Sequence, residues 1–145
     1  MKKYIQKNRR FYVEALFSIF ISTICAVSLQ FLKGEVLDYA VAGDMTHTLS
    51  NAILLIVFIL LEILFYYIYC RLSIKFVTNC TKYLKKDIFE SILNKSYVSY
   101  KEHTQGEYLT KYTTEADAIR DLHFKMLPMF WEILFKIILV SISLF

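Results

Sequence analysis

The chain has little glycine and proline, and its cysteines and histidines do not form a metal-binding pattern. Its 145 residues include three Gly, one Pro and three Cys. Neither a G-x-x-x-x-G-K-[ST] nor a G-x-G-x-x-G phosphate loop occurs, which excludes nucleotide binding by a known loop. Cys25, Cys70 and Cys80 lack C-x-x-C spacing and are expected to be reduced thiols. The histidines are scattered, so no metal site is predicted.

Charged residues are scarce as well. They make up 21% of the chain, whereas 57% of its residues are hydrophobic, against about 45–50% in soluble domains. The apolar excess gathers in three runs, at residues 11–32, 52–70 and 127–145, each long enough to cross about 30 Å of hydrocarbon as a helix. A soluble enzyme is therefore excluded. The third run reaches Phe145 without a polar flank, so we expect a truncated fragment of a longer protein or an abrupt C-terminus.

Basic residues predict how the runs are oriented. Residues 1–10 hold five basic residues and no acid, residues 33–51 hold one Lys and three acids, and residues 71–86 again hold five basic residues. Because basic flanks mark the cytoplasmic side, we expect a cytoplasmic N-terminus, an outer 33–51 loop and a cytoplasmic 71–126 stretch in the cell membrane. A cleaved signal peptide is disfavoured, since the first run exceeds the usual core of about 7–15 residues.

The cytoplasmic stretch, residues 71–126, is predicted to be a helical hairpin. Two sets of residues recur at intervals of three and four, as on one face of a helix. The first set is Val77, Cys80, Leu84, Ile88 and Ile92, and the second is Leu109, Tyr112, Ala116, Ile119 and His123. Between them, residues 96–106 carry the only Gly of the stretch and predict a tip with a short helix. The tip residues Tyr97 and Tyr100 either dock into a partner, which we favour, or fold back on the flanking helices.

Two segments of this hairpin resemble the first intracellular loop of the ABC exporter transmembrane domain. They are Leu84 to Leu93 (LKKDIFESIL) and Gly106 to Ile119 (GEYLTKYTTEADAI). Gly106 and Glu107 match the Gly-acid pair of the family, Leu109 the aliphatic residue that follows, Lys111 the basic position and Ile119 the closing aliphatic residue. The departures are Ser99-Tyr100-Lys101 in place of Phe-Phe-Asp, Lys111 for Arg, and Glu115 where the family usually has Asp.

The resemblance covers nearly the whole chain and implies an all-α membrane protein, the N-terminal part of a six-span half-transporter. It implies a basic elbow at residues 1–10, three transmembrane helices, and a coupling helix near residues 97–105 that joins the cytosolic extensions of the second and third. In the family, this helix contacts a nucleotide-binding domain, which binds ATP and Mg. By resemblance, the contact residues are Tyr97, Tyr100, Lys101, Glu102 and His103.

Several polar residues lie within the predicted spans. Glu62, near the middle of the second span, is either a substrate-path residue or a protonated or hydrogen-bonded structural residue. Glu132 and Lys136 are four residues apart and are expected to neutralise each other. A stripe of small residues, Ser18, Ser22 and Ala26, predicts close helix packing on the first span.

The leading hypothesis is the membrane-spanning part of an ATP-driven exporter with an unidentified substrate. It would have no catalytic residues and no cofactor of its own. Its expected partners are a nucleotide-binding domain, a second transmembrane half and the lipid bilayer, and no nucleic acid. The alternative is a stand-alone three-span immunity, sensor or accessory protein whose hairpin binds a cytosolic partner. A membrane enzyme is disfavoured, because no Ser/His arrangement or paired intramembrane acids occur.

Overall fold

The computed structural model describes residues 2–94 and 105–143, and every element within these ranges is a helix. Three helices are long and apolar enough to cross a membrane, namely Arg9–Val41, Met45–Leu93 and Gly106–Ser143. The predicted all-α membrane fold is confirmed. Residues 97–104 of the expected coupling helix lie outside the described residues.

The elements follow one another with few interruptions, because the chain contains almost no helix-breaking residues. Their bounds are α1 (Lys2–Lys7), α2 (Arg9–Val41), α3 (Met45–Leu93), α5 (Gln105–Thr110), the π-helix η1 (Lys111–Glu115), α6 (Ala116–Ile119), the π-helix η2 (Arg120–Lys125) and α7 (Met126–Ser143).

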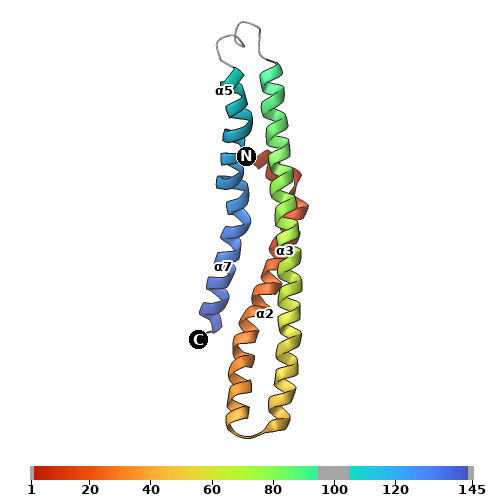
Figure 1. The fold of residues 1–145 in the computed structure, drawn as a ribbon, viewed down its shortest axis with the longest axis vertical. Helices are drawn as coiled ribbons and strands as arrows, with labels where there is room; N and C mark the ends of the chain where they lie inside the picture. The colour runs from red at the N-terminus through yellow and green to blue at the C-terminus, as the bar shows by residue number, and fades with distance from the viewer. Residues whose placement is uncertain (1, 95–104, 144–145) are drawn as a thin grey trace. The chain divides into compact units, whose positions relative to one another are not determined.

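A short turn joins α2 to α3 (Figure 1). Gly43 has a φ of +78°, and the N–H groups of Gly43 and Asp44 donate to the carbonyls of Ala40 and Tyr39 at 3.2 and 3.1 Å. This is the Schellman pattern, for which glycine is favoured at the left-handed position. Asp44 then caps α3, because its Oδ1 accepts from the N–H of His47 at 3.2 Å. Helix therefore extends on both sides of the turn through most of the predicted outer loop.

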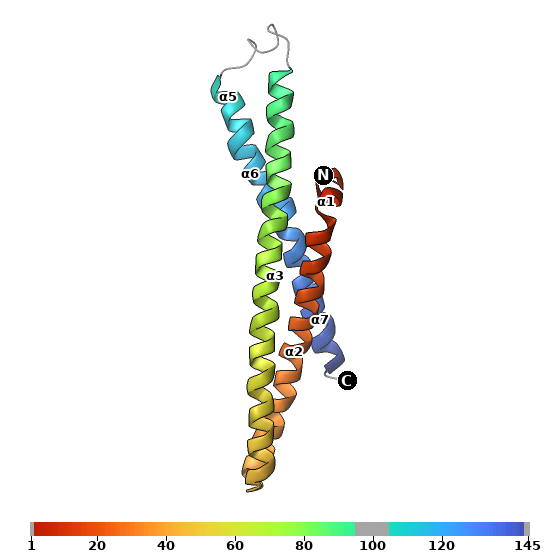
Figure 2. The same ribbon diagram turned by 90° about the vertical axis from the view of Figure 1, so that its right-hand side faces the viewer.

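The chain forms two compact units. The arm unit comprises Met1–Val13 and Leu72–Met129, and the span unit comprises Glu14–Arg71 and Phe130–Phe145. Within the arm unit, α5 and α6 run beside the C-terminal part of α3 in both views (Figures 1 and 2). The prediction of helices on both sides of the hairpin is confirmed.

The arm unit has a core of five buried side chains. Phe76, Cys80 and Leu84 recur every four residues on α3, and they pack with Ala116 and Phe124 of the returning arm. The N-terminal segment closes this core with partly buried hydrophobic residues, namely Tyr4, Ile5, Phe11 and Tyr12. Cys80 and Leu84 belong to the predicted apolar face, whereas the fully buried Phe76 was not in that set.

The returning arm does not keep the regular α-helical period that we predicted. Leu109 and His123 are exposed, whereas the buried residues of this arm include Tyr108, Ala116, Phe124 and Pro128. These positions are separated by multiples of four residues. Four residues of an α-helix overshoot a full turn by about 40°, or about 200° over the 20 residues from Tyr108 to Pro128.

The two π-helical segments compensate for this overshoot. Each π turn accommodates one additional residue, so η1 and η2 each rotate the following residues back by about 100°. Pro128 lies in the first turn of α7, directly after η2, and it has no N–H to donate to the carbonyl of Phe124. The local widening therefore keeps one face of the arm on the core.

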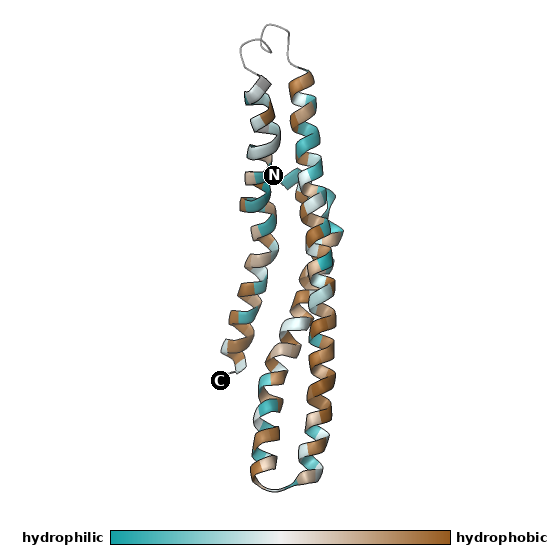
Figure 3. Ribbon diagram, in the orientation of Figure 1, coloured by the Kyte–Doolittle hydropathy of each residue, from teal (hydrophilic) through white to brown (hydrophobic). Residues whose placement is uncertain are grey.

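In the span unit, α2 is the more enclosed helix. The most apolar 18-residue window of α2 is 44% buried, whereas that of α3 is 6% buried. Ser18 and Ser22 of the predicted small-residue stripe are buried and Ala26 is half-buried, and Ser22 Oγ donates to the main-chain carbonyl of Glu62 at 3.5 Å. The hydropathy colouring shows the apolar stretch of α3 in this unit (Figure 3). Much of its surface has no cover within the described chain.

Truncating a core leucine tests the packing of the arm unit. Leu84 is 7% exposed and Leu93, on the same helix, is 65% exposed. We expect Leu84→Ala to lower the free energy of unfolding by about 2–5 kcal/mol, because it leaves a cavity, and Leu93→Ala to change it by less than about 1 kcal/mol. Thermal unfolding of the purified protein in detergent measures both. Equal effects of the two substitutions would contradict the proposed core.

Candidate functional sites

The N-terminal segment is fastened to α3 at Asp87. Lys3 Nζ lies 3.1 Å from Asp87 Oδ2, and Tyr4 Oη donates to the same oxygen at 2.8 Å. The ring of Tyr4 also meets Phe124 edge-on, with 6.2 Å between the ring centroids. Tyr4 therefore contacts α3 through its hydroxyl and the returning arm through its ring.

These contacts shift the pKa values of Asp87 and Tyr4 in opposite directions. The hydrogen bond from Tyr4, followed by that from Lys3, lowers the pKa of Asp87 below its ordinary value of 3.8. Burial, followed by the hydrogen bond to Asp87, raises the pKa of Tyr4 to about 12. The stabilisation from Asp87 is complete above pH 3.8 and is lost as the pH falls through its lowered pKa. That from Tyr4 is complete below pH 10.0 and is lost as the pH rises through about 12.

A second group of contacts surrounds Cys80. Asn8 Nδ2 donates to Cys80 Sγ at 3.6 Å, and the thiol donates to the main-chain carbonyl of Tyr4 at 3.6 Å. The ammonium of Lys7 lies 3.9 Å from the ring centroid of Tyr83. Burial raises the pKa of the Cys80 thiol to about 11, so it is not a nucleophile near neutral pH. Cys80 is thus a free and buried thiol in the arm unit.

Charged residues connect the two arms beside the core. Lys85 Nζ of α3 lies 3.0 Å from Asp117 Oδ1 of α6, and Asp117 also pairs with Arg120 at 3.2 Å. These groups are partly exposed, so each pair contributes little stability. The Lys85–Asp117 pair joins the two arms, whereas Arg120 lies on the same arm as Asp117.

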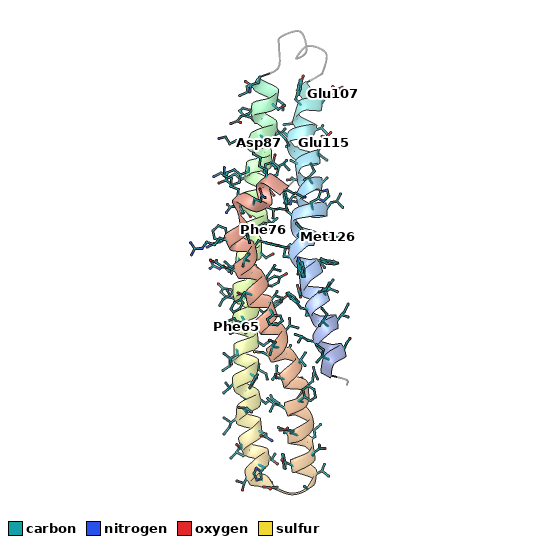
Figure 4. All side chains as sticks on the ribbon, turned by 180° about the vertical axis from the view of Figure 1, so that it is seen from behind. Phe65, Phe76, Asp87, Glu107, Glu115 and Met126 are labelled. Carbon is teal, nitrogen blue, oxygen red and sulfur yellow. The ribbon has the colours of Figure 1, made fainter. Side chains whose placement is uncertain are left out.

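A groove lies between the arms, beside the C-terminal part of α3. It encloses about 400 Å³, and Figure 4 shows two of its lining residues, Asp87 and Glu115, on opposite arms. Its remaining lining residues are Leu84, Ile88, Ser91, Ile92, Tyr108 and Ile119. The predicted contact residues Tyr97, Tyr100, Lys101, Glu102 and His103 lie outside the described residues. Their assignment stays a prediction.

The span unit contains a polar cluster. Lys136 Nζ lies 2.8 Å from Glu132 Oε1, which confirms the expected local pair, and Tyr69 Oη donates to Glu132 Oε2 at 3.1 Å. Both carboxylate oxygens of Glu132 are thus bound. The partner Tyr69 was missed from the sequence, because no local pattern connects residues 63 positions apart.

Glu62 differs from Glu132. Its side chain is half-buried and lines a hollow of about 440 Å³ together with Ile63, Tyr66, Tyr67 and Cys70. Within residues 2–94 and 105–143, no side chain forms a hydrogen bond or an ion pair with its carboxylate. No group of His, Cys, Asp and Glu in the same part of the chain could hold a metal ion.

Long apolar helices and a helical hairpin that packs its own core define a multi-pass membrane protein. Its family follows from the sequence as a whole. Residues 12–145 match the ABC transporter transmembrane region, so the chain belongs to this family of membrane transport domains. No curated protein and no solved structure is significantly similar to the chain.

Replacing the aspartate that fastens the N-terminal segment tests the coupling to Tyr4. In Asp87→Asn, we expect the pKa of Tyr4 to fall while staying above 10.0, because the carboxylate is lost but burial, the larger cause, remains. NMR titration of tyrosine labelled with ¹³C at Cζ measures this pKa. Asp121→Asn is the control, since Asp121 pairs with Arg120. A Tyr4 pKa that is unchanged in Asp87→Asn would disprove the contact.

Removing Glu132 tests whether its carboxylate is needed to neutralise the Lys136 ammonium within the span. We expect Glu132→Gln to reduce thermal stability, because it leaves the Lys136 ammonium unpaired in a span. The double variant Glu132→Gln/Lys136→Met should recover most of the loss. Glu90→Gln, which breaks the exposed pair with Lys86, is the control and should have little effect. Additive losses in the double variant would contradict this interpretation.

Proposed function

We propose that the chain is the membrane-spanning part of an ATP-driven exporter and that its arm unit transmits work from a nucleotide-binding domain. In this proposal, ATP and Mg are bound by that domain, and the present chain catalyses nothing by itself. The observation that carries the proposal is the packed core of the arm unit, because a hairpin must hold its arms together to transmit a displacement.

The contacts of the arm unit suit this role. Phe76, Cys80 and Leu84 bind one arm to Ala116 and Phe124 of the other. α3 continues from the span unit into the arm unit without a helix break. In this proposal, a displacement of the hairpin is transmitted along the continuous helix α3 to the membrane-spanning segments.

The charge pattern supports a cytoplasmic position for the arms. Basic residues dominate residues 1–10 and 71–86, whereas acids dominate residues 33–51. By the positive-inside rule, the N-terminus and the hairpin would lie in the cytosol and the α2–α3 turn outside. The arms would then be on the side of the membrane where ATP is available.

The uncovered surface of α3 supports assembly with further membrane segments. Only 6% of its most apolar window is buried within the described chain. We propose that other spans of the same transporter, and a second transmembrane half, cover part of this surface while lipid covers the rest. Movement of these bundles against one another as rigid bodies would give alternating access.

Site-specific crosslinking tests the proposed coupling. In the transporter that contains this chain, Tyr100→Cys should form an adduct with a cysteine in the nucleotide-binding domain, because Tyr100 lies at the predicted tip. Thr46→Cys, on the exposed surface near the α2–α3 turn, is the control and should instead react with a membrane-impermeant thiol reagent added outside. Adducts are measured by gel electrophoresis. An active transporter without the Tyr100 adduct, or with Thr46 labelled only from inside, would contradict the proposal.

A further inference from the structure

A basic hollow lies on the arm unit, lined by α3 and by the returning arm. It encloses about 650 Å³, which is within the range of small-molecule sites. Both arms contribute to it, so the packing that forms the core also shapes the hollow. Among the described residues, its lining contains four cations, two aromatic rings and no acid. The cations are Lys82, Lys85, Lys86 and Arg120, and the rings are Phe89 and Tyr112.

Two of the four cations are already paired with acids of the returning arm. Asp117 Oδ1 lies 3.0 Å from Lys85 Nζ and 3.2 Å from Arg120. Arg120 also lies 3.0 Å from Asp121, on which Lys125 acts electrostatically. These three cations and two acids carry a net charge of +1. The acids near the hollow therefore leave no excess negative charge beside it.

The other two cations are available to an anionic ligand. Lys82 forms no hydrogen bond or ion pair within residues 2–94 and 105–143. Lys86 Nζ lies 3.4 Å from Glu90 Oε1, in an exposed pair that contributes little stability. Lys82 and Lys86 are four residues apart on α3, so they lie on one face of the helix. Together they present two ammonium groups, the point charges that bind phosphate.

An exposed aromatic ring lies next to these two lysines. Phe89 follows Lys86 by three residues on α3, and its side chain is 52% exposed. The ring of Phe89 meets the ring of Tyr112 with 6.2 Å between the centroids, and Lys85 Nζ lies 5.8 Å from the centroid of Tyr112. A planar ring can stack on an exposed aromatic side chain. From Lys82 to Phe89 the helix rises about 10.5 Å, so one small molecule can reach both the lysines and the ring.

The position of the two lysines on α3 favours a soluble ligand over a lipid headgroup. The second apolar run ends at Cys70, and Lys82 and Lys86 follow it by about 18 and 24 Å of helix. The headgroup layer of a bilayer adds only about 5–8 Å on each side of the hydrocarbon.

We propose that this hollow binds a phosphate ester that carries an aromatic ring, which is the chemistry of a mononucleotide. Lys82 and Lys86 bind the phosphate, and the ring stacks on Phe89 beside Tyr112. Because Tyr112 belongs to the returning arm, the bound ligand contacts both arms and stabilises their packed arrangement. The cytosolic position of the site rests on the proposed function, whereas its geometry belongs to the arm unit alone.

Photolabelling tests where such a ligand binds. An azido derivative of AMP is crosslinked to the transporter that contains this chain, in nanodiscs of neutral lipid, and labelled tryptic peptides are identified by mass spectrometry. We expect label on peptides 87–95 and 112–120, which contain Phe89 and Tyr112. These peptides are distinct from those of a nucleotide-binding domain, so ATP sites do not confuse the result. Competition by unlabelled AMP at these two peptides measures its Kd.

Four substitutions of exposed side chains separate the phosphate contact from the ring contact. Lys82→Gln should raise the Kd of AMP about tenfold, because a charge-assisted hydrogen bond is lost. Phe89→Leu should raise it at least about fivefold, because stacking is lost while apolar volume is kept. Glu90→Gln should lower it, because Lys86 loses its competing partner. Lys75→Gln is the matched control, since this exposed lysine of α3 lies outside the hollow, and it should leave the Kd unchanged.

Several outcomes would overturn the inference. They are the absence of label from both peptides, an unchanged Kd in Lys82→Gln, and an equal loss in Lys75→Gln, which would indicate a diffuse attraction of anions. Ribose phosphate that competes as well as AMP would remove the ring from the site. Loss of AMP binding when anionic lipid is added to the nanodiscs would assign the lysines to headgroups. The Tyr100 adduct is independent of this site, so an adduct without labelling removes only the inference, and labelling without the adduct removes only the coupling role.

Discussion

The arms of the hairpin stay together because five side chains between them are removed from water. Phe76, Cys80 and Leu84 occupy one face of α3, and Ala116 and Phe124 meet them from the returning arm. Burial of each large apolar side chain contributes about 1.5–3 kcal/mol. The partly exposed ion pairs beside this core contribute far less. The packed core holds the two arms together, and the Lys85–Asp117 ion pair is a consequence of that packing.

The N-terminal segment makes this two-helix arrangement a three-part unit. Tyr4 packs edge-on against Phe124, and its hydroxyl donates a hydrogen bond to Asp87. Asn8 and the main chain of Tyr4 enclose Cys80 from the same side. A basic segment that by composition suggests a membrane-surface elbow is therefore also a part of the core. Its loss would expose apolar surface on both arms.

The span unit follows a different constraint, because the bilayer supplies no hydrogen bonds to compensate polar groups. Glu132 meets this constraint within the chain, through Lys136 and Tyr69. Glu62 does not meet it within the described residues. The two acids carry the same chemical group and differ in the partners that the described residues give them.

Composition and periodicity determined much of the fold. Long apolar runs require helices in a membrane, and the scarcity of Gly and Pro lets those helices continue beyond the apolar runs. Spacing alone placed Cys80 and Leu84 in the core and paired Glu132 with Lys136. Only the tertiary structure decided that Tyr108 and Phe124, instead of Leu109 and His123, face the core. The reason is that two π-helical segments change the period of the returning arm, and such a change follows from packing against α3 and the N-terminal segment. The partners Tyr69 of Glu132 and Tyr4 of Asp87 were likewise decided by the tertiary structure, because each pair joins residues more than sixty positions apart, and no local pattern carries that information.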